Sequence, residues 1–115
     1  MLKAPECVPE LGFYYHYKHD PAKGVRDYAY EVIGIGSHTE TDAWLLNYRP
    51  LYVSAAVYQM SLKLGIPITD ERPLEMFFDE NVEKDGKVYP RRFTKITDLA
   101  VIEVLTKARN EMYPF

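Results

Sequence analysis

The sequence predicts a mainly β domain, a small and strongly bent barrel or roll that carries two helices. Three observations lead to this fold class. The chain has 115 residues, a usual length for one domain. Ten of them are tyrosine, which favours strands and half-exposed surfaces because its ring packs while its hydroxyl seeks a hydrogen bond. Short aromatic and β-branched runs alternate with turn residues, and two longer segments have helical spacing.

We predict one domain, 1–115, with three parts. Residues 1–11 contain two prolines and few apolar residues, so we expect a tail or an arm that packs on an edge. Residues 12–96 form the barrel, and 97–115 contain the C-terminal helix.

The first three strands are predicted from aromatic and β-branched segments: Phe13 to Lys18, Tyr28 to Gly36 and Trp44 to Arg49. The period of two along a strand puts Phe13 and Tyr14 on opposite faces. The polar stretch 37–42 is typical of a turn, so the second and third strands form an antiparallel hairpin.

A helix is predicted over about 54–65, between the barrel strands. Ser54 is a candidate N-cap and Gly65 suits the C-terminal stop. A β extension is the alternative, because the tyrosines and valines around it are poor helix formers. Pro73 to Phe78 is expected to start a single helical turn, since proline suits the first helical position.

The remaining elements are a hairpin and the C-terminal helix. Asp85-Gly86 is the best hairpin turn in the chain, because glycine readily takes a positive φ. A strand follows over Lys87 to Ile96, interrupted at Pro90. The helix is expected over about 97–112 with Thr97 as N-cap, and its apolar stripe packs on the sheet or forms a homodimer seam.

Composition limits the classes of function. Cys7 is the only cysteine, so no intramolecular disulfide forms. The start of the chain lacks the apolar core of a signal peptide and no run is long enough to cross a membrane, so we expect a soluble cytoplasmic protein. The net charge of −3 disfavours nucleic-acid binding, although residues 84–95 hold five basic side chains against Asp85.

Several motifs together resemble one known family. They are Gly12 to Lys18, Tyr30 to Thr41, Tyr48 to Tyr52, Arg72 to Phe77 and Pro90 to Phe93. Their order and content are similar to the domain-of-unknown-function 1653 family of small bacterial proteins. The resemblance implies an SH3-like barrel over about residues 12–93 and no particular activity. This chain departs from the family pattern by an insertion at 53–69 and by Asp70-Glu71 before Arg72-Pro73.

The polar cluster that most suggests catalysis is His38-Thr39-Glu40-Thr41, at the expected hairpin tip. A histidine with a carboxylate two residues away is a candidate acid/base pair. Two ligands fall short of a zinc site, so no metal is predicted. The alternative is that the threonine and glutamate side chains of this cluster stabilise the turn by bonding backbone groups, while His38 satisfies a buried carbonyl. Gly34-Ile35-Gly36 lacks the third glycine of a dinucleotide motif, and no cofactor is expected.

Arg49 and Arg72 each precede a proline and are candidate ligand-binding residues. Arginine recognises carboxylates and phosphates through two parallel hydrogen bonds, and proline restricts the backbone beside it. Each arginine could instead pair with Glu40 or Glu75 to close the barrel. The rings of Tyr14, Tyr48 and Tyr52 are predicted to line a groove beside the two arginines.

Three functions remain open. The first is a non-enzymatic binding module for a peptide or a small anionic ligand. The second is a small enzyme that uses His38 and Glu40 with Arg49 as an anion clamp. The third is weak nucleic-acid binding through residues 84–95. The sequence is compatible with a monomer or a homodimer.

Overall fold

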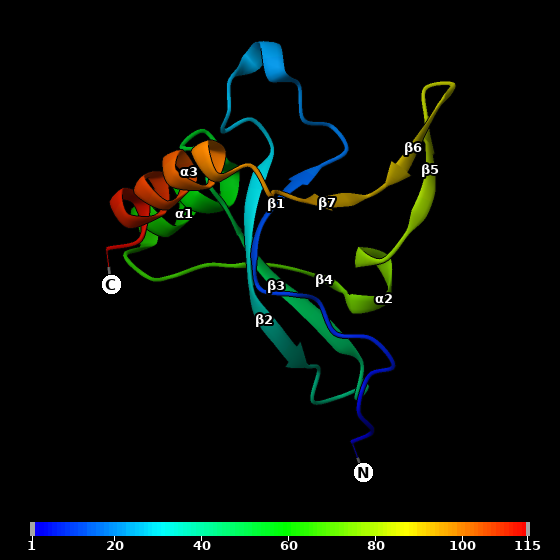
Figure 1. The fold of residues 1–115 in the computed structure, drawn as a ribbon. Coiled ribbons are helices and arrows are strands. Elements are labelled where there is room, and N and C mark those ends of the chain that lie inside the picture. The colour runs from blue at the N-terminus through cyan, green and yellow to red at the C-terminus, as the bar shows by residue number, and fades with distance from the viewer. Residues whose placement is uncertain (1, 115) are drawn as a thin grey trace.

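A curled antiparallel sheet of five strands forms the centre of the molecule (Figure 1). The computed structural model describes residues 2–114. The strand order is β4-β3-β2-β1-β7. The strands are β1 (Gly12–His16), β2 (Ala29–Ser37), β3 (Trp44–Pro50), β4 (Asp70–Pro73) and β7 (Phe93–Lys95). The prediction of a mainly β, small barrel-like fold is confirmed.

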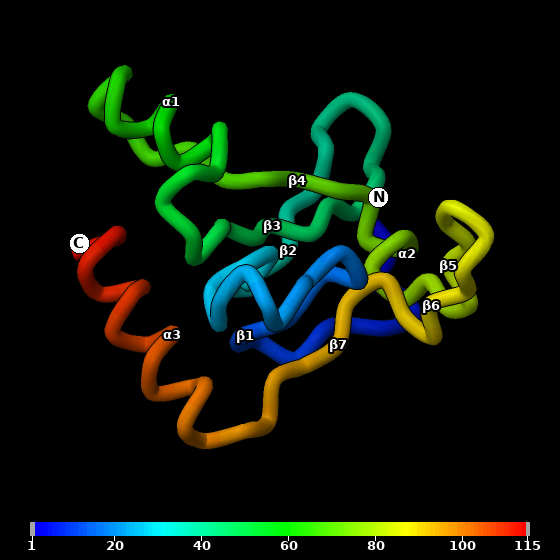
Figure 2. Tube along the Cα trace, turned by 90° about the horizontal axis from the view of Figure 1, so that it is seen from above, coloured from blue at the N-terminus to red at the C-terminus, as the bar shows by residue number. Residues whose placement is uncertain are grey.

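The sheet curves so that its two edge strands approach each other. Viewed from above, the strands follow an arc with β4 and β7 at its ends (Figure 2). The register between β2 and β3 shifts between Val32 and Gly34, and such a bulge increases the local twist and bend. The short helix α2 (Leu74–Phe77) lies at the gap, where Leu74 and Phe77 pack with Phe93 of β7. The helical turn predicted after Pro73 is therefore confirmed.

The strands β5 (Glu80–Lys84) and β6 (Lys87–Arg91) form a separate two-stranded sheet. Figure 1 shows this hairpin projecting from the molecule on the side opposite α1 and α3. The turn predicted at Asp85-Gly86 is confirmed, with φ values of 51° and 78°. The strand predicted over Lys87 to Ile96 is interrupted, but at Arg92 and not at Pro90, and its second part continues as β7 in the main sheet.

Two longer helices and a 3-10 turn, η1 (Pro21–Lys23), complete the fold. α1 (Ala56–Leu64) ends at Gly65 in the left-handed conformation, as predicted, but Ala55 and not Ser54 occupies its N-cap. α3 (Leu99–Met112) is capped by Asp98, whose carboxylate accepts hydrogen bonds from the amides of Ala100 and Val101. The N-cap of α3 is therefore Asp98, one residue after the predicted N-cap Thr97. No helix among residues 2–114 has the length and apolar character to cross a membrane.

Each face of the sheet has its own core, because successive side chains of a strand point to opposite faces. The concave face holds an aromatic core that includes Tyr14, Tyr30 and Tyr48. The convex face holds a core in which Phe13 and Leu51 pack under Leu105 of α3. The predicted division of Phe13 and Tyr14 between two faces is confirmed.

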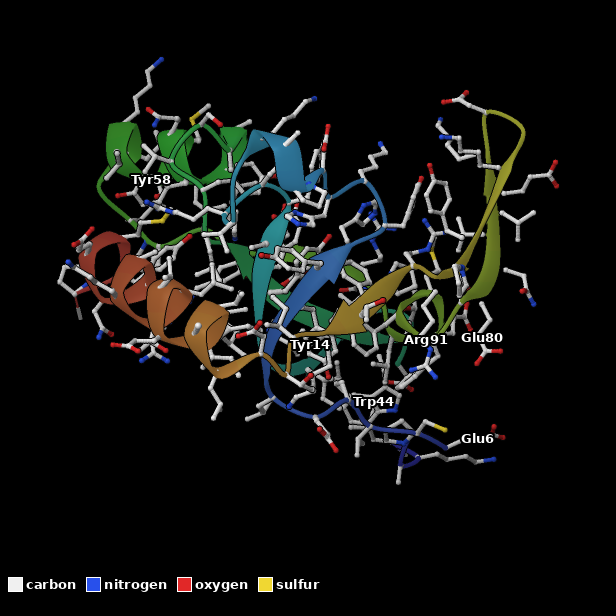
Figure 3. All side chains as sticks on the ribbon, turned by 45° about the horizontal axis from the view of Figure 1, so that its top comes forward. Glu6, Tyr14, Trp44, Tyr58, Glu80 and Arg91 are labelled. Carbon is white, nitrogen blue, oxygen red and sulfur yellow. The ribbon has the colours of Figure 1, made fainter. Side chains whose placement is uncertain are left out.

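The N-terminal residues lie along the sheet rather than away from it. The indole nitrogen of Trp44 donates to the carbonyl of Lys3 at 2.8 Å, and the hydroxyl of Tyr14 donates to the carbonyl of Glu10 at 2.8 Å. Figure 3 shows Trp44 beside the segment that carries Glu6. This segment therefore contacts the strands at two points.

Candidate functional site

The structure places the two predicted arginines on opposite faces of the sheet. Arg49 of β3 lies opposite Glu31 of β2 in the strand register. Arg72 of the edge strand β4 lies opposite Leu46, a residue of the concave core. Residues that are directly opposite in an antiparallel pair share a face. Arg72 therefore belongs to the concave face, whereas Arg49 belongs to the convex face under the end of α3.

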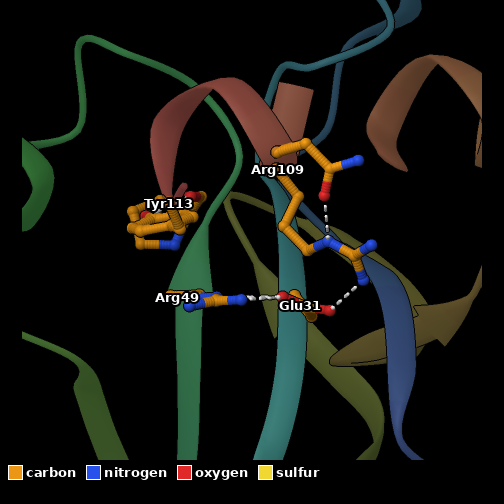
Figure 4. A network of polar contacts seen from close by, with 6 residues as sticks. Glu31, Arg49, Arg109 and Tyr113 are labelled. Atoms are coloured by element: carbon orange, nitrogen blue, oxygen red, sulfur yellow. Dashed lines mark hydrogen bonds and ion pairs between the residues drawn. The ribbon is translucent and has the colours of Figure 1, made fainter. Parts of the chain in front are cut away.

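On the convex face, Arg49 is held in an ion-paired network (Figure 4). Its Nε lies 2.9 Å and its Nη2 2.8 Å from one oxygen of Glu31. Arg109 of α3 lies 3.1 Å from the other oxygen, and the Arg49 guanidinium stacks on the ring of Tyr113 at 4.3 Å. We call Glu31, Arg49, Arg109 and Tyr113 the convex-face cluster. The predicted pairing of Arg49 with Glu40 or Glu75 is therefore wrong.

On the concave face, Arg72 has no such partner. Among residues 2–114 its guanidinium makes no ion pair and no hydrogen bond, although the side chain is half-buried. Its central carbon lies 5.9 Å from the centre of the Phe93 ring on the opposite edge strand. Arg72 therefore reaches across the gap between β4 and β7 without an ion pair among the described residues.

The three tyrosines predicted to line a groove differ in how deeply they are buried. Tyr14 and Tyr48 are 6% and 7% exposed and belong to the concave core, so neither presents a ring surface to solvent. Tyr52 is half-buried, and its hydroxyl forms a 2.7 Å hydrogen bond with that of Tyr30. Of the three predicted groove-lining rings, Tyr52 is the one that retains access to solvent.

His16 also lies on the concave face, although it is not among the site residues predicted from the sequence. The side chain is 8% exposed and lies at the end of β1 against the ring of Phe93. Burial lowers the pKa of His16 to about 4, and the neighbouring charges of Arg72, Lys18 and Arg92 contribute to this decrease. His16 is therefore neutral at pH 7. Its Nδ1 accepts from the amide of Lys18 at 3.2 Å, so Nε2 carries the proton and can donate it.

Two further groups complete the surroundings of Arg72. Burial raises the pKa of Asp70, which lies two residues before Arg72 on the same face, and the Arg72 charge partly offsets that rise. The ring of Tyr28 lies 5.8 Å from those of both His16 and Tyr52. Tyr28 has a φ of 48°, a strained value for a bulky residue. We call His16, Tyr28, Tyr52, Asp70 and Arg72 the concave-face cluster.

His38 and Glu40 lie far from both clusters. They are exposed at the tip of the β2–β3 hairpin, where the amide of Glu40 donates to Nδ1 of His38 at 3.2 Å. The tip begins beside Trp44, and Arg49 is five strand steps away, about 17 Å. The acid/base site that combines His38 and Glu40 with Arg49 is therefore wrong. Side chains do stabilise this turn, since the hydroxyl of Thr41 accepts from the amide of Ala43 at 3.3 Å. The expected contact of His38 with a buried carbonyl is wrong, because its ring accepts from the amide of Glu40.

The basic segment 84–95 is partly neutralised. Arg92 pairs with Asp79 at 3.1 Å and Lys95 pairs with Glu10 at 3.1 Å. Lys84, Lys87 and Arg91 are exposed on the β5–β6 hairpin, whose strand β5 also carries Glu80 and Glu83. Figure 3 shows Glu80 and Arg91 close together at the base of that hairpin. No group of three or more metal-ligating side chains occurs in the described part of the chain.

The comparisons with known proteins agree with the motif pattern. A family model described as protein of unknown function (DUF1653) matches residues 12–95. The chain belongs to this family. The match includes every member of the concave-face cluster, and it ends before α3, which supplies Arg109 of the convex-face cluster. No curated protein and no solved structure matches the chain.

Proposed function

We propose that this family member is a ligand-binding module whose concave-face cluster binds the carboxylate or phosphate group of a small molecule or of a peptide end. The observation that carries the proposal is the half-buried guanidinium of Arg72, which has no anionic partner among residues 2–114. A partly buried charge is stabilised when an opposite charge pairs with it. A bound anion supplies that charge.

Comparison with the other arginines supports this proposal. Arg49 and Arg109 share Glu31, and Arg92 pairs with Asp79. Arg26 donates from Nε to the carbonyl of Leu51 at 2.7 Å. Within residues 2–114, Arg72 is thus distinguished from these half-buried arginines by its lack of an acceptor.

The neighbours of Arg72 determine which ligands fit. The Nε2 proton of neutral His16 is a second donor toward an anion. The half-buried ring of Tyr28 lies between His16 and Tyr52, so the two tyrosines add planar apolar surface next to His16. The carboxylate of Asp70 accepts hydrogen bonds, so a ligand with a hydroxyl or amine near its anionic group fits better than a bare anion.

Chemical-shift titration of the labelled protein with phosphate, benzoate and a short peptide tests the proposal. We expect saturable shifts at the amides of β4, His16 and Phe93 at millimolar ligand, with larger shifts for benzoate because its ring adds contacts to the tyrosines. The peptide is compared with its C-terminally amidated form, which separates recognition of a peptide end from recognition of small acids.

Two variants locate the binding. Arg72→Met removes the cation and retains a long side chain, and it should abolish the shifts. The matched control is Arg91→Met on the exposed hairpin, which should retain them. Unchanged shifts in Arg72→Met, or no shifts in the wild type, would overturn the proposal.

A further inference from the structure

A separate cavity lies between α1, residues 65–69 and the C-terminal end of α3. Its volume is about 390 Å³, which is within the range of small-molecule sites. Most of its wall is apolar and includes Leu62, Ile66 and Met112, while Arg49 contributes the charged part of the lining. Figure 3 shows Tyr58 of α1 facing α3, and its ring lies 5.6 Å from that of Tyr113. We call this cavity the helix groove.

The walls of the helix groove are unusually exposed for apolar side chains. None of the nine residues of α1 is buried. Leu62 is 58% and Ile66 is 57% exposed. Contact of such side chains with water is unfavourable. An apolar ligand that covers them therefore binds more favourably in proportion to the apolar area removed from solvent.

The charge at the helix groove is positive. Arg49 lines the groove, and Arg26 reaches the groove residue Met112 with Nη2 at 3.0 Å from the sulfur. Arg109 lies beside Arg49, and the two share the carboxylate of Glu31. Arg49 and Arg109 thus share one carboxylate, which leaves a net charge of +1 among these three side chains. An anionic head group is therefore electrostatically favoured here.

Arg49 has donor capacity left for such a head group. Its contacts with Glu31 use Nε and Nη2, and a guanidinium has five N–H donors, so Nη1 is available. Burial raises the pKa of Tyr113 to about 12, so its hydroxyl is neutral and donates to the carbonyl of Pro50 at neutral pH. The aromatic ring under Arg49 thus brings no negative charge that would repel an anion.

We infer that the helix groove binds a monocarboxylic acid with a linear hydrocarbon tail, with its carboxylate at Arg49 and its tail against Leu62, Ile66 and Met112. Apolar walls with one cationic group at an end match the chemistry of such a ligand. The groove shares no residue with the concave-face cluster. Because α3 lies beyond residues 12–95, the groove depends on a segment outside the family match.

Calorimetric titration of the full chain with decanoate, decanol and decyltrimethylammonium tests this inference. The two ionic ligands are kept below their micelle concentrations, and decanol is kept below its solubility limit. We expect decanoate to bind at least about tenfold more tightly than decanol, which lacks the charge-assisted hydrogen bond. The cationic analogue should bind most weakly. Equal affinity for decanoate and decanol would overturn the role of Arg49.

A matched pair of variants tests the location. Ile66→Glu places a negative charge at the groove and should lower decanoate affinity at least about tenfold. Val88→Glu changes an equally exposed apolar residue of the hairpin and should leave the affinity unchanged. Retention of affinity in Ile66→Glu would overturn the inference. So would binding to anionic phospholipid vesicles without binding of free decanoate, since that result indicates a membrane surface as the occupant.

Discussion

The two faces of the sheet each hold a half-buried arginine followed by a proline, and the surroundings of the two arginines differ. On the convex face, Arg49 is paired with Glu31, braced by Arg109 and stacked on Tyr113. On the concave face, Arg72 lies near Phe93 and, among residues 2–114, makes no ion pair. The same local sequence, arginine before proline, thus gives an ion-paired network in one place and an open cation in the other.

The difference follows from what lies opposite each arginine. Arg49 faces Glu31 across the β2–β3 ladder, whereas Arg72 faces Leu46 from an edge strand that has no further strand beside it in the described sheet. Removal of one member of the convex-face cluster is destabilising, because it leaves a partly buried charge unpaired. An open cation contributes little to stability and remains able to bind an anion.

The largest effect is expected from the convex-face cluster. Glu31→Gln leaves two arginines without their carboxylate and should lower the free energy of unfolding by about 3 kcal/mol. Urea denaturation monitored by circular dichroism measures it. Glu111→Gln, an exposed change on α3, should stay within about 0.5 kcal/mol of the wild type. A loss below about 1 kcal/mol for Glu31→Gln would mean that apolar packing alone holds α3.

Acid should affect the concave face through His16. Its pKa in the folded protein, about 4, is below the ordinary value of 6.5, so the unfolded chain takes up the proton first as the pH falls. The free energy of unfolding is therefore unaffected by His16 titration above pH 6.5. It decreases as the pH falls from 6.5 toward 4, by about 3 kcal/mol at most.

The difference between wild type and His16→Gln isolates this effect, because other groups titrate in both proteins. Free energies of unfolding measured from pH 7 to pH 4 should converge for the two proteins as the pH falls. His38→Gln on the exposed hairpin tip serves as the control and should follow the wild type. Parallel curves for wild type and His16→Gln would show that His16 is not held neutral by its surroundings.

A smaller loss is expected when Arg49 alone is changed. Arg49→Met removes the charge-assisted hydrogen bond and the contact with Tyr113, but Glu31 keeps Arg109. We expect a decrease of about 2 kcal/mol in the free energy of unfolding, from urea denaturation. Arg91→Met is the control on the hairpin. A change as small as that of the control would remove the contrast between the two faces.

The smallest effect is expected at Arg72. Arg72→Met should change the free energy of unfolding by no more than about 0.5 kcal/mol, because no ion pair within residues 2–114 is broken. Thermal unfolding with and without phosphate sharpens the test, since phosphate should stabilise the wild type more than the variant. A loss comparable to that of Glu31→Gln would indicate a structural role for Arg72.

Most of the fold could be predicted from local sequence, whereas only Arg72 and Tyr52 of the concave-face cluster could. The Asp85-Gly86 turn, the Gly65 stop and the C-terminal helix follow from backbone preferences of a few neighbouring residues. The partner of Arg49 could not be predicted, because Glu31 is eighteen positions away and the register of two strands brings it there. Arg109 lies farther still and reaches the cluster only when α3 docks.

His16 shows the same limit in another way. Its sequence neighbours Tyr17, Lys18 and His19 are polar or amphipathic and give no sign of burial. Its burial and its lowered pKa involve Phe93, Arg72 and Arg92, all more than fifty residues away. The signal that the sequence did carry was the position of His16 inside an aromatic strand, which places it on the same face as Tyr14.

By itself the sequence determined the class of fold, the main turns and the family, because strand alternation, turn glycines and short motifs act over a few residues or in a fixed order. The tertiary structure decided which arginine is ion-paired and which is open. It did so because side-chain charge is neutralised by contacts in space, and the curl of the sheet, the docking of α3 and the position of β4 at an edge determine those contacts.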